Sequence, residues 1–347
     1  MNFRYNFFFI IFFVFFYTVT AAAQSPAYLV ATNDPPRIKM NLEELQKVND
    51  ETTETEINIS TDLSKVQQRR QLMTYLKGIS DADIQYDPVK AKQLYHLANL
   101  FTKLRLYPLA MKCFFKTVRL GIDSISTGDI PFTAMDDSSL EKQESLLGSD
   151  TDKVIKSEPI STEAITETFD DGKNAIAYAI IFHVKQPVRG KPKVFTKLSN
   201  TGHTFITLIK YNSDSTYAAV SFGFYPKKKN PLSATPIIPS TPSTFKEDSE
   251  HNWDEVLGKF ISKRRFNKLL ELTQQYHNVA YHLCKNNCTD FGLKAADIAG
   301  LQISDTKGSW PLGSGNNPGT TGQSLLQGKF KNADTGDSEY LLITNRD

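Results

Sequence analysis

The sequence predicts an α+β protein in which a small helical module precedes an antiparallel sheet packed on helices. Between residues 87 and 120, apolar residues recur at helical spacing. From Ala175 onward the pattern changes to short apolar runs bounded by Gly, Pro, Asn or Ser, which is typical of strands. An acidic stretch rich in Ser and Thr lies between the two regions, so we place the domain boundary between Gly121 and Asp171.

The first residues have the features of a secretory signal. Arg4 precedes an apolar run from Phe7 to Tyr17, and residues 21–23 form an A-x-A cleavage site. This run is shorter than the roughly 20 residues that cross a bilayer. We therefore expect a signal peptide at residues 1–23 and an exported protein, periplasmic or extracellular, with no stable membrane span after cleavage. An uncleaved N-terminal anchor is the alternative.

Residues 24–65 are polar and acidic without a sustained apolar period, which is typical of a disordered linker. The whole chain has 40 basic and 38 acidic residues. So small an excess of positive charge predicts no nucleic-acid partner.

The next segment, residues 66–123, is expected to form a helical module. Small Ala98 and Ala110 alternate with large Phe101 and Phe114 at helical spacing. This alternation resembles one tetratricopeptide repeat, in which small residues let two helices approach and aromatic residues fill the gaps. A plain helical hairpin is the alternative interpretation.

The break between these two helices is expected at residues 106–108, which include Pro108. One hairpin cannot bury its apolar face alone, so it must pack on a preceding helix near residues 66–76, on the second domain or on a protein partner. Cys113 lies among apolar residues of the second helix and is expected in the core.

Residues 124–170 are expected to be a flexible acidic linker, because they contain few aromatic residues and no clear period. The second domain then spans residues 171–347. Strands are expected in AIAYAIIFHVKQP, KVFTKL, HTFITLIKY and YAAVSFGFYP, and the last two form a hairpin that turns at residues 212–215. Residues 253–277 carry an apolar stripe and are expected to be one helix.

Two of the three cysteines lie near the start of a further expected helix, Cys288 to Ala299. Asn287 suits the N-cap, Asp290 completes a capping box, and Gly300 ends the helix. Backbone N–H groups and the helix dipole at the first turn favour a thiolate at Cys288.

Cys284 lies outside this helix, in the preceding loop. Three cysteines leave at least one thiol unpaired. A Cys284–Cys288 disulfide, a metal site with His282 or His277, and inert thiols are the alternatives to a reactive Cys288. The spacing matches no strong metal pattern, and we expect neither metal nor cofactor.

A thiolate catalyst also needs a base, and His203 is the candidate. Gly202-His203 opens the strand HTFITLIKY, where a histidine can face a helix N-terminus across the sheet. A purely structural histidine at a strand end is the alternative.

GHTFITL in a strand, a following strand, and then NNCTDF at a helix start resemble the circularly permuted branch of the papain-like cysteine hydrolases. That branch includes relatives of the NlpC cell-wall peptidases and of the lecithin:retinol acyltransferases. The resemblance covers about residues 175 to 325 and implies a papain-like, permuted NlpC-like domain. The motifs GHTFITL, FGFYP and NNCTDFGL also resemble those of a group of exported bacterial proteins, and this resemblance implies no function.

The resemblance implies that Cys288 is the nucleophile and His203 its base and later its acid. A third polar group that orients the imidazole is expected on the strand after the histidine. A turn at Ser213-Asp214 would place His203 opposite Phe224, which makes Ser221 and Tyr225 the candidates.

Other contacts are expected around the thiol. The oxyanion would be held by the Cys288 backbone N–H with the Asn287 or Asn286 side chain, unless those asparagines form only the cap and its turn. The C-terminal segment that begins at Ser309 is expected to fold over the cleft and to bring Trp310 and Asn316 to the substrate; a surface loop is the alternative.

These expectations predict an exported cysteine hydrolase or amidase that acts through a Cys-His dyad on cell-wall peptide or another amide. An acyltransferase or thioesterase is an alternative within the same fold. The alternative from another class is a non-catalytic binding or scaffold protein that holds a protein partner with its helical module.

Overall fold

The computed structural model describes residues 64–81, 87–120, 129–147, 157–194, 201–227 and 230–346. The chain divides into two compact units, residues 1–152 and 153–347. The expected signal peptide and almost all of the expected disordered linker lie outside the described residues. Among the helices that are described, none is long and apolar enough to cross a membrane.

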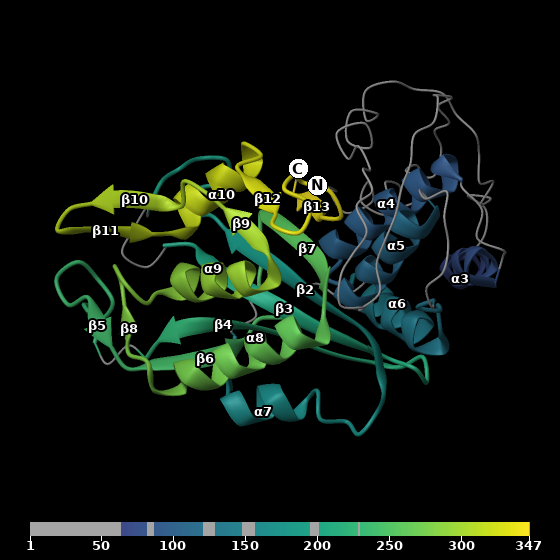
Figure 1. Ribbon diagram of the computed structural model, residues 1–347, viewed down its shortest axis with the longest axis horizontal. Helices are drawn as coiled ribbons and strands as arrows, with labels where there is room; N and C mark the ends of the chain where they lie inside the picture. Colours follow the sequence, from purple (N-terminus) through teal and green to yellow (C-terminus); the bar gives the residue numbers. More distant parts are fainter. Residues whose placement is uncertain are drawn as a thin grey trace. The chain divides into compact units, whose positions relative to one another are not determined.

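The first unit is helical, with a hairpin at its centre. The hairpin consists of α4 (Pro88–Lys103) and α5 (Tyr107–Leu120), as Figure 1 shows. Ala98 and Ala110 are fully buried, as their small size requires for close helix packing, and Phe101 and Phe114 are 1% exposed. The helical hairpin predicted from these residues is confirmed. α3 (Lys65–Asp81) precedes it, and α6 (Ala134–Leu147) follows it.

The prediction of a flexible linker over residues 124–170 is wrong for much of its length. This segment contains α6 and, in the second unit, β1 (Pro159–Ile160) and α7 (Thr162–Glu167). A buried ion pair holds α6 in place: Asp136 is 0% exposed and accepts a 2.7 Å hydrogen bond from Lys112 Nζ. Because its partner lies on α5, local composition could not reveal this contact.

The second unit is built on a seven-stranded antiparallel sheet. Its strand order is β1-β6-β4-β3-β2-β7-β13. The strands not yet given bounds are β2 (Ala175–Lys185), β3 (His203–Asn212), β4 (Tyr217–Pro226), β6 (Ser243–Glu247), β7 (Glu255–Ile261) and β13 (Leu342–Asn345). The chain is therefore an α+β protein, and the β3–β4 hairpin is confirmed.

Helices α8 (Lys263–Gln275) and α9 (Cys288–Ala299) lie across one face of this sheet (Figure 1). The core between them and the sheet is aromatic and aliphatic, with Phe182, Phe222 and Phe291 fully buried. Gly292 lets α9 approach closely, since a Cβ there would stand 2.6 Å from Thr204 Cγ2. This close contact sets the start of α9 beside the start of β3.

The single helix expected over residues 253–277 is wrong. The segment forms β7, then α8, then a short 3-10 helix, Tyr276–Asn278. β7 lies between β2 and β13 and every one of its residues is buried, so its apolar run is continuous rather than alternating. Ser262 begins α8 by accepting a hydrogen bond from the Arg265 backbone N–H.

Smaller elements complete the described part of the second unit. They are the pairs β5 (Ser240–Thr241) with β8 (Tyr281–His282), β10 (Lys307–Trp310) with β11 (Gly313–Asn316) and β9 (Leu301–Ile303) with β12 (Phe330–Asn332), and the helix α10 (Pro318–Leu326). The C-terminal segment is thus a hairpin and a helix rather than a surface loop. The strand expected in KVFTKL is absent at Lys193 and Val194, and its other residues lie outside the described part.

We expect Asp136→Ala to destabilise the helical unit by about 3–5 kcal/mol, because it leaves the buried Lys112 ammonium without its carboxylate. Asp137→Ala is the matched control, because the Asp137 side chain is 40% exposed in its pair with Arg69 and should contribute less than about 1 kcal/mol. Hydrogen exchange of the α5 amides in the full chain measures both changes. Equal effects of the two substitutions would contradict this assignment.

Candidate active site

Cys288 begins α9, at the helix position that the sequence predicts. The Asn287 side-chain oxygen accepts hydrogen bonds from the backbone N–H groups of Thr289 and Asp290, at 2.8 and 3.0 Å. The Asp290 carboxylate accepts from the Asn287 N–H at 2.9 Å, which completes the capping box. Gly300 ends the helix with a positive φ of 80°. The thiol therefore sits at the positive end of a well-defined helix.

His203 opens β3 and is 5% exposed. Its Nε2 lies 3.0 Å from Asp248 Oδ2. This contact makes Nε2 the nitrogen that donates to the carboxylate, and leaves Nδ1 as the ring nitrogen available to Cys288, with which His203 interacts. The structure thus brings together the predicted nucleophile, the predicted base and a carboxylate that the sequence did not indicate.

Asp248 follows β6 directly and is 1% exposed. Its second oxygen, Oδ1, accepts hydrogen bonds from the Tyr225 hydroxyl and the Ser157 hydroxyl, each at 2.7 Å. Gly223 makes room for the pair, because a Cβ on that residue would overlap the His203 ring and stand 2.5 Å from Asp248 Oδ2. A buried carboxylate with this many donors remains ionised and fixes the imidazole.

The electrostatics of the site favour an imidazolium facing a thiolate. Burial alone would lower the pKa of His203, but the charge and hydrogen bond of Asp248 and the interaction with Cys288 raise it to about 9. Burial acts in the opposite sense on Cys288, where the hydrogen bond and charge of His203 and a contact with the Thr204 backbone give a net lowering of the thiol pKa. At neutral pH each ionised group therefore stabilises the other.

The structure does not place Ser221 in this constellation. Its hydroxyl lies 2.7 Å from Thr207 Oγ1, which in turn lies 2.8 Å from Nε2 of the buried His183. The expected register was also wrong by one residue. Phe205 pairs with Gly223, so His203 lies beside Tyr225, with ring centroids 4.2 Å apart, rather than Phe224. A shift of one residue exchanges the two faces of a strand.

Two hydroxyl groups lie at the sulfur. The Tyr281 hydroxyl and Thr289 Oγ1 are each 4.0 Å from Cys288 Sγ. Burial and the neighbouring thiolate hold the pKa of Tyr281 well above its ordinary value, against a hydrogen bond from the Cys288 backbone N–H. Tyr281 therefore keeps its proton and remains a donor. Nothing in the sequence distinguished it from other tyrosines.

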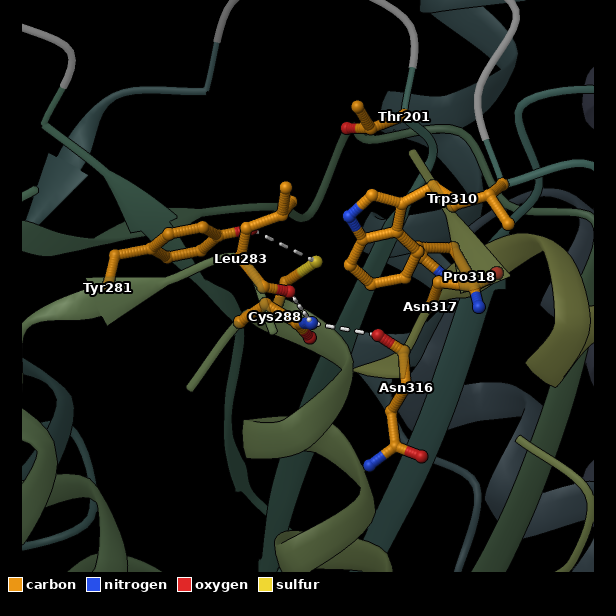
Figure 2. Close-up of a pocket in the computed structure, with 10 residues that line it drawn as sticks. Thr201, Tyr281, Leu283, Cys288, Trp310, Asn316, Asn317 and Pro318 are labelled. Carbon is orange, nitrogen blue, oxygen red and sulfur yellow. Dashed lines mark hydrogen bonds between the residues drawn. The ribbon is translucent and has the colours of Figure 1, made fainter. Parts of the chain in front are cut away.

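The Cys288 sulfur lines a pocket at the start of α9. Figure 2 shows that β8, α9 and the C-terminal hairpin contribute its walls. The described lining residues are Val194, Thr201, Tyr281, Leu283, Asn287, Cys288, Trp310, Asn316, Asn317 and Pro318. Trp310 thus lines the same pocket as the thiol, and its predicted contact with the substrate stays a prediction.

The asparagines are more constrained than expected. Besides its capping bonds, Asn287 donates through Nδ2 to the carbonyl oxygens of Leu283 and Asn316, each at 2.8 Å, so its side chain has no free N–H for an oxyanion. The Asn316 side chain bonds to Asp290 and Thr306 and turns away from the sulfur in Figure 2. Asn286 is outside the lining set and pairs with His282 through its backbone.

Neither a Cys284–Cys288 disulfide nor a metal site is formed by the described residues around this cysteine pair. Cys284 and Cys288 are free thiols, and the Cys284 backbone N–H donates to His282 Nδ1 at 3.1 Å. Within the described ranges, no cluster of three or more His, Cys, Asp or Glu residues could hold a metal ion. Cys113 is fully buried in α5, as expected.

Comparisons of this chain with protein-family models, with curated proteins and with solved structures find no match.

We expect iodoacetamide to alkylate Cys288 rapidly at pH 7 in a Cys284→Ser background, where the remaining Cys113 is buried. Because the thiol pKa is lowered, the rate should fall only in acid, as the thiolate takes up a proton. His203→Ala should reduce the pH 7 rate roughly tenfold or more and move the acid limb to higher pH. A wild-type profile that rises only near the pKa of an ordinary thiol would contradict this account.

Asp248→Asn and Ser221→Ala provide a matched pair for the same measurement. Loss of the Asp248 charge should lower the pKa of His203 and so destabilise its imidazolium form. The pH profile of alkylation should then move toward that of His203→Ala. Ser221→Ala should leave the profile in place, because Ser221 bonds to Thr207.

Proposed function

We propose that this protein is a cysteine hydrolase that acts through Cys288, His203 and Asp248. The observation that carries the proposal is the buried His203 ring, held at Nε2 by Asp248 and coupled to the Cys288 thiol, whose pKa it lowers. Nucleophile, base and orienting carboxylate thus come from three separate elements of the fold, α9, β3 and the end of β6. Such a constellation is suited to acyl transfer.

The first half of the reaction forms a thioester. The Cys288 thiolate attacks the substrate carbonyl carbon, and the π electrons of the carbonyl move to its oxygen. We assign the Cys288 backbone N–H and the Tyr281 hydroxyl, which lies 4.0 Å from the sulfur, as the donors that hold this oxyanion. When the tetrahedral intermediate collapses, the C–N or C–O bond breaks, and His203 Nδ1–H protonates the leaving amine or alcohol.

The second half releases the acid. Neutral His203 accepts a proton from a water molecule as that water attacks the thioester carbonyl, and the C–S bond breaks to return the thiolate. Asp248 keeps Nε2 protonated through both halves, so Nδ1 is the nitrogen that exchanges protons. The two hydroxyl donors on Asp248 Oδ1 hold the carboxylate in this orientation.

The fold also supports the proposal that the second unit is a permuted papain-like hydrolase domain. A helix that begins with the nucleophile and packs on an antiparallel sheet that carries the histidine is the arrangement implied by the permuted papain-like, NlpC-like resemblance. We propose further that the chain is exported and that its substrate is a cell-wall peptide or another amide. Transfer of the acyl group to an acceptor other than water would use the same thioester, and the helical hairpin is the candidate surface for a protein partner.

The test is covalent capture. The wild-type protein, incubated with a p-nitrophenyl ester and quenched in acid, should carry the acyl group on Cys288 by peptide mass spectrometry. Cys288→Ala should lose at least about 10³-fold in p-nitrophenol release, because it removes the nucleophile. A panel of N-acyl amides and wall-derived stem peptides then identifies the amide that is cleaved.

Cys284→Ala is the matched control, since it removes the neighbouring thiol but not the one coupled to His203. It should keep both the acyl adduct and the release rate. Undiminished turnover by folded Cys288→Ala would rule out the proposal and favour a binding or scaffold role.

A further inference from the structure

We propose that the indole N–H of Trp310 binds a carbonyl oxygen in the acyl part of the substrate, so that the site prefers acyl groups with such an acceptor over plain alkyl chains. This inference rests on the proposed function and narrows it to a substrate class, peptide-like acyl groups. The observation behind it is an unpaired donor: Trp310 Nε1 is buried and has no hydrogen-bond partner.

The position of this donor fits a substrate contact. Trp310 is 8% exposed and lines the pocket into which Cys288 opens. In Figure 2 the nitrogen edge of the indole is turned toward Leu283 and toward the side where the sulfur lies. A buried N–H without a partner is unfavourable, so a ligand that supplies an acceptor gains binding free energy there.

The backbone of Gly313 packs closely against the nitrogen edge of the indole. Gly313, the residue paired with Trp310 across β10 and β11, has no side chain next to the ring. A Cβ at Gly313 would stand 2.9 Å from Nε1 and 2.8 Å from Cys284 Sγ. Any larger residue at position 313 would therefore crowd Nε1, and the β10–β11 hairpin holds the indole in position.

The rest of the described lining selects for a neutral group. Apart from the Cys288 thiolate it contains no charged side chain, and Leu283, Val194 and Pro318 provide apolar surface. The asparagine side chains at the pocket make other bonds: Asn287 and Asn317 cap helices, and Asn316 donates to Asp290. The Trp310 N–H is thus a buried, unpaired donor of this lining that can bind an amide-bearing acyl group and gains nothing from an alkyl group of the same length.

Three p-nitrophenyl esters of matched chain length test this inference. The N-acetylglycyl ester carries an amide carbonyl, the 4-oxopentanoyl ester carries a ketone at the same position, and the pentanoyl ester carries neither. For the wild-type protein and for Trp310→Phe, kcat/KM is measured with each ester. Comparing the ratios between the two proteins cancels the intrinsic reactivities of the esters.

Trp310→Phe should reduce the preference for the two carbonyl-bearing esters over the pentanoyl ester by roughly 3- to 10-fold, the effect of losing one neutral hydrogen bond. Gly313→Ala keeps the indole but covers its N–H, and should reduce the preference in the same way. An unchanged preference in both folded variants, with hydrolysis still dependent on Cys288, would overturn this inference alone. Hydrolysis that does not depend on Cys288 would overturn the proposed function with it.

Discussion

A buried carboxylate, Asp248, is the constraint on which the rest of the site depends. It lies at the end of β6, two strands from His203, and reaches the imidazole across Gly223 of the intervening strand. One oxygen holds His203 Nε2, and the other accepts from Tyr225 and Ser157. Because the carboxylate is ionised and fixed, the imidazole can carry a proton in a buried place, and the thiol can lose one.

The close contact between α9 and β3 supplies the other half of this arrangement. Gly292 allows the helix to lie directly on Thr204 and Phe182, while the capping box defines where the helix begins. The side chains that surround the thiol are consequently committed to structure: Asn287 caps, and Asn316 holds Asp290. Among the described lining residues, Trp310 Nε1 is a buried donor that this network leaves unpaired.

Local signals explain what could be predicted from the sequence. The N-cap, the capping box and the terminating glycine of α9 are all adjacent in the chain, and the β3–β4 hairpin is bounded by its own turn. Contacts between distant segments explain the errors. The residues of β7 were predicted to be helical because a strand that is buried on both faces has a continuous apolar run. Helix α6 was missed because its buried Asp136 pairs with Lys112 of another helix.

The failure to predict Asp248, the carboxylate that orients the His203 ring, has the same explanation. The orienting group was sought on the strand next to His203, whereas Asp248 comes from the strand beyond, and its position depends on sheet order that no local pattern encodes. One signal was present: Gly223 interrupts an aromatic strand, and a glycine in a strand interior often marks a close approach by another group. The predicted pairing of β3 with β4 was also shifted by one residue. It placed Phe224 opposite His203, where the structure has Tyr225.

The central claim is that His203 is charged because Asp248 and the Cys288 thiolate both face it. An NMR titration of the His203 ring measures this directly. The account predicts a pKa of about 9 in the wild-type protein and a lower pKa in Cys288→Ala, because the thiolate that stabilises the imidazolium is gone. A ring that titrates near the usual value of about 6.5, unchanged by Cys288→Ala, would contradict it.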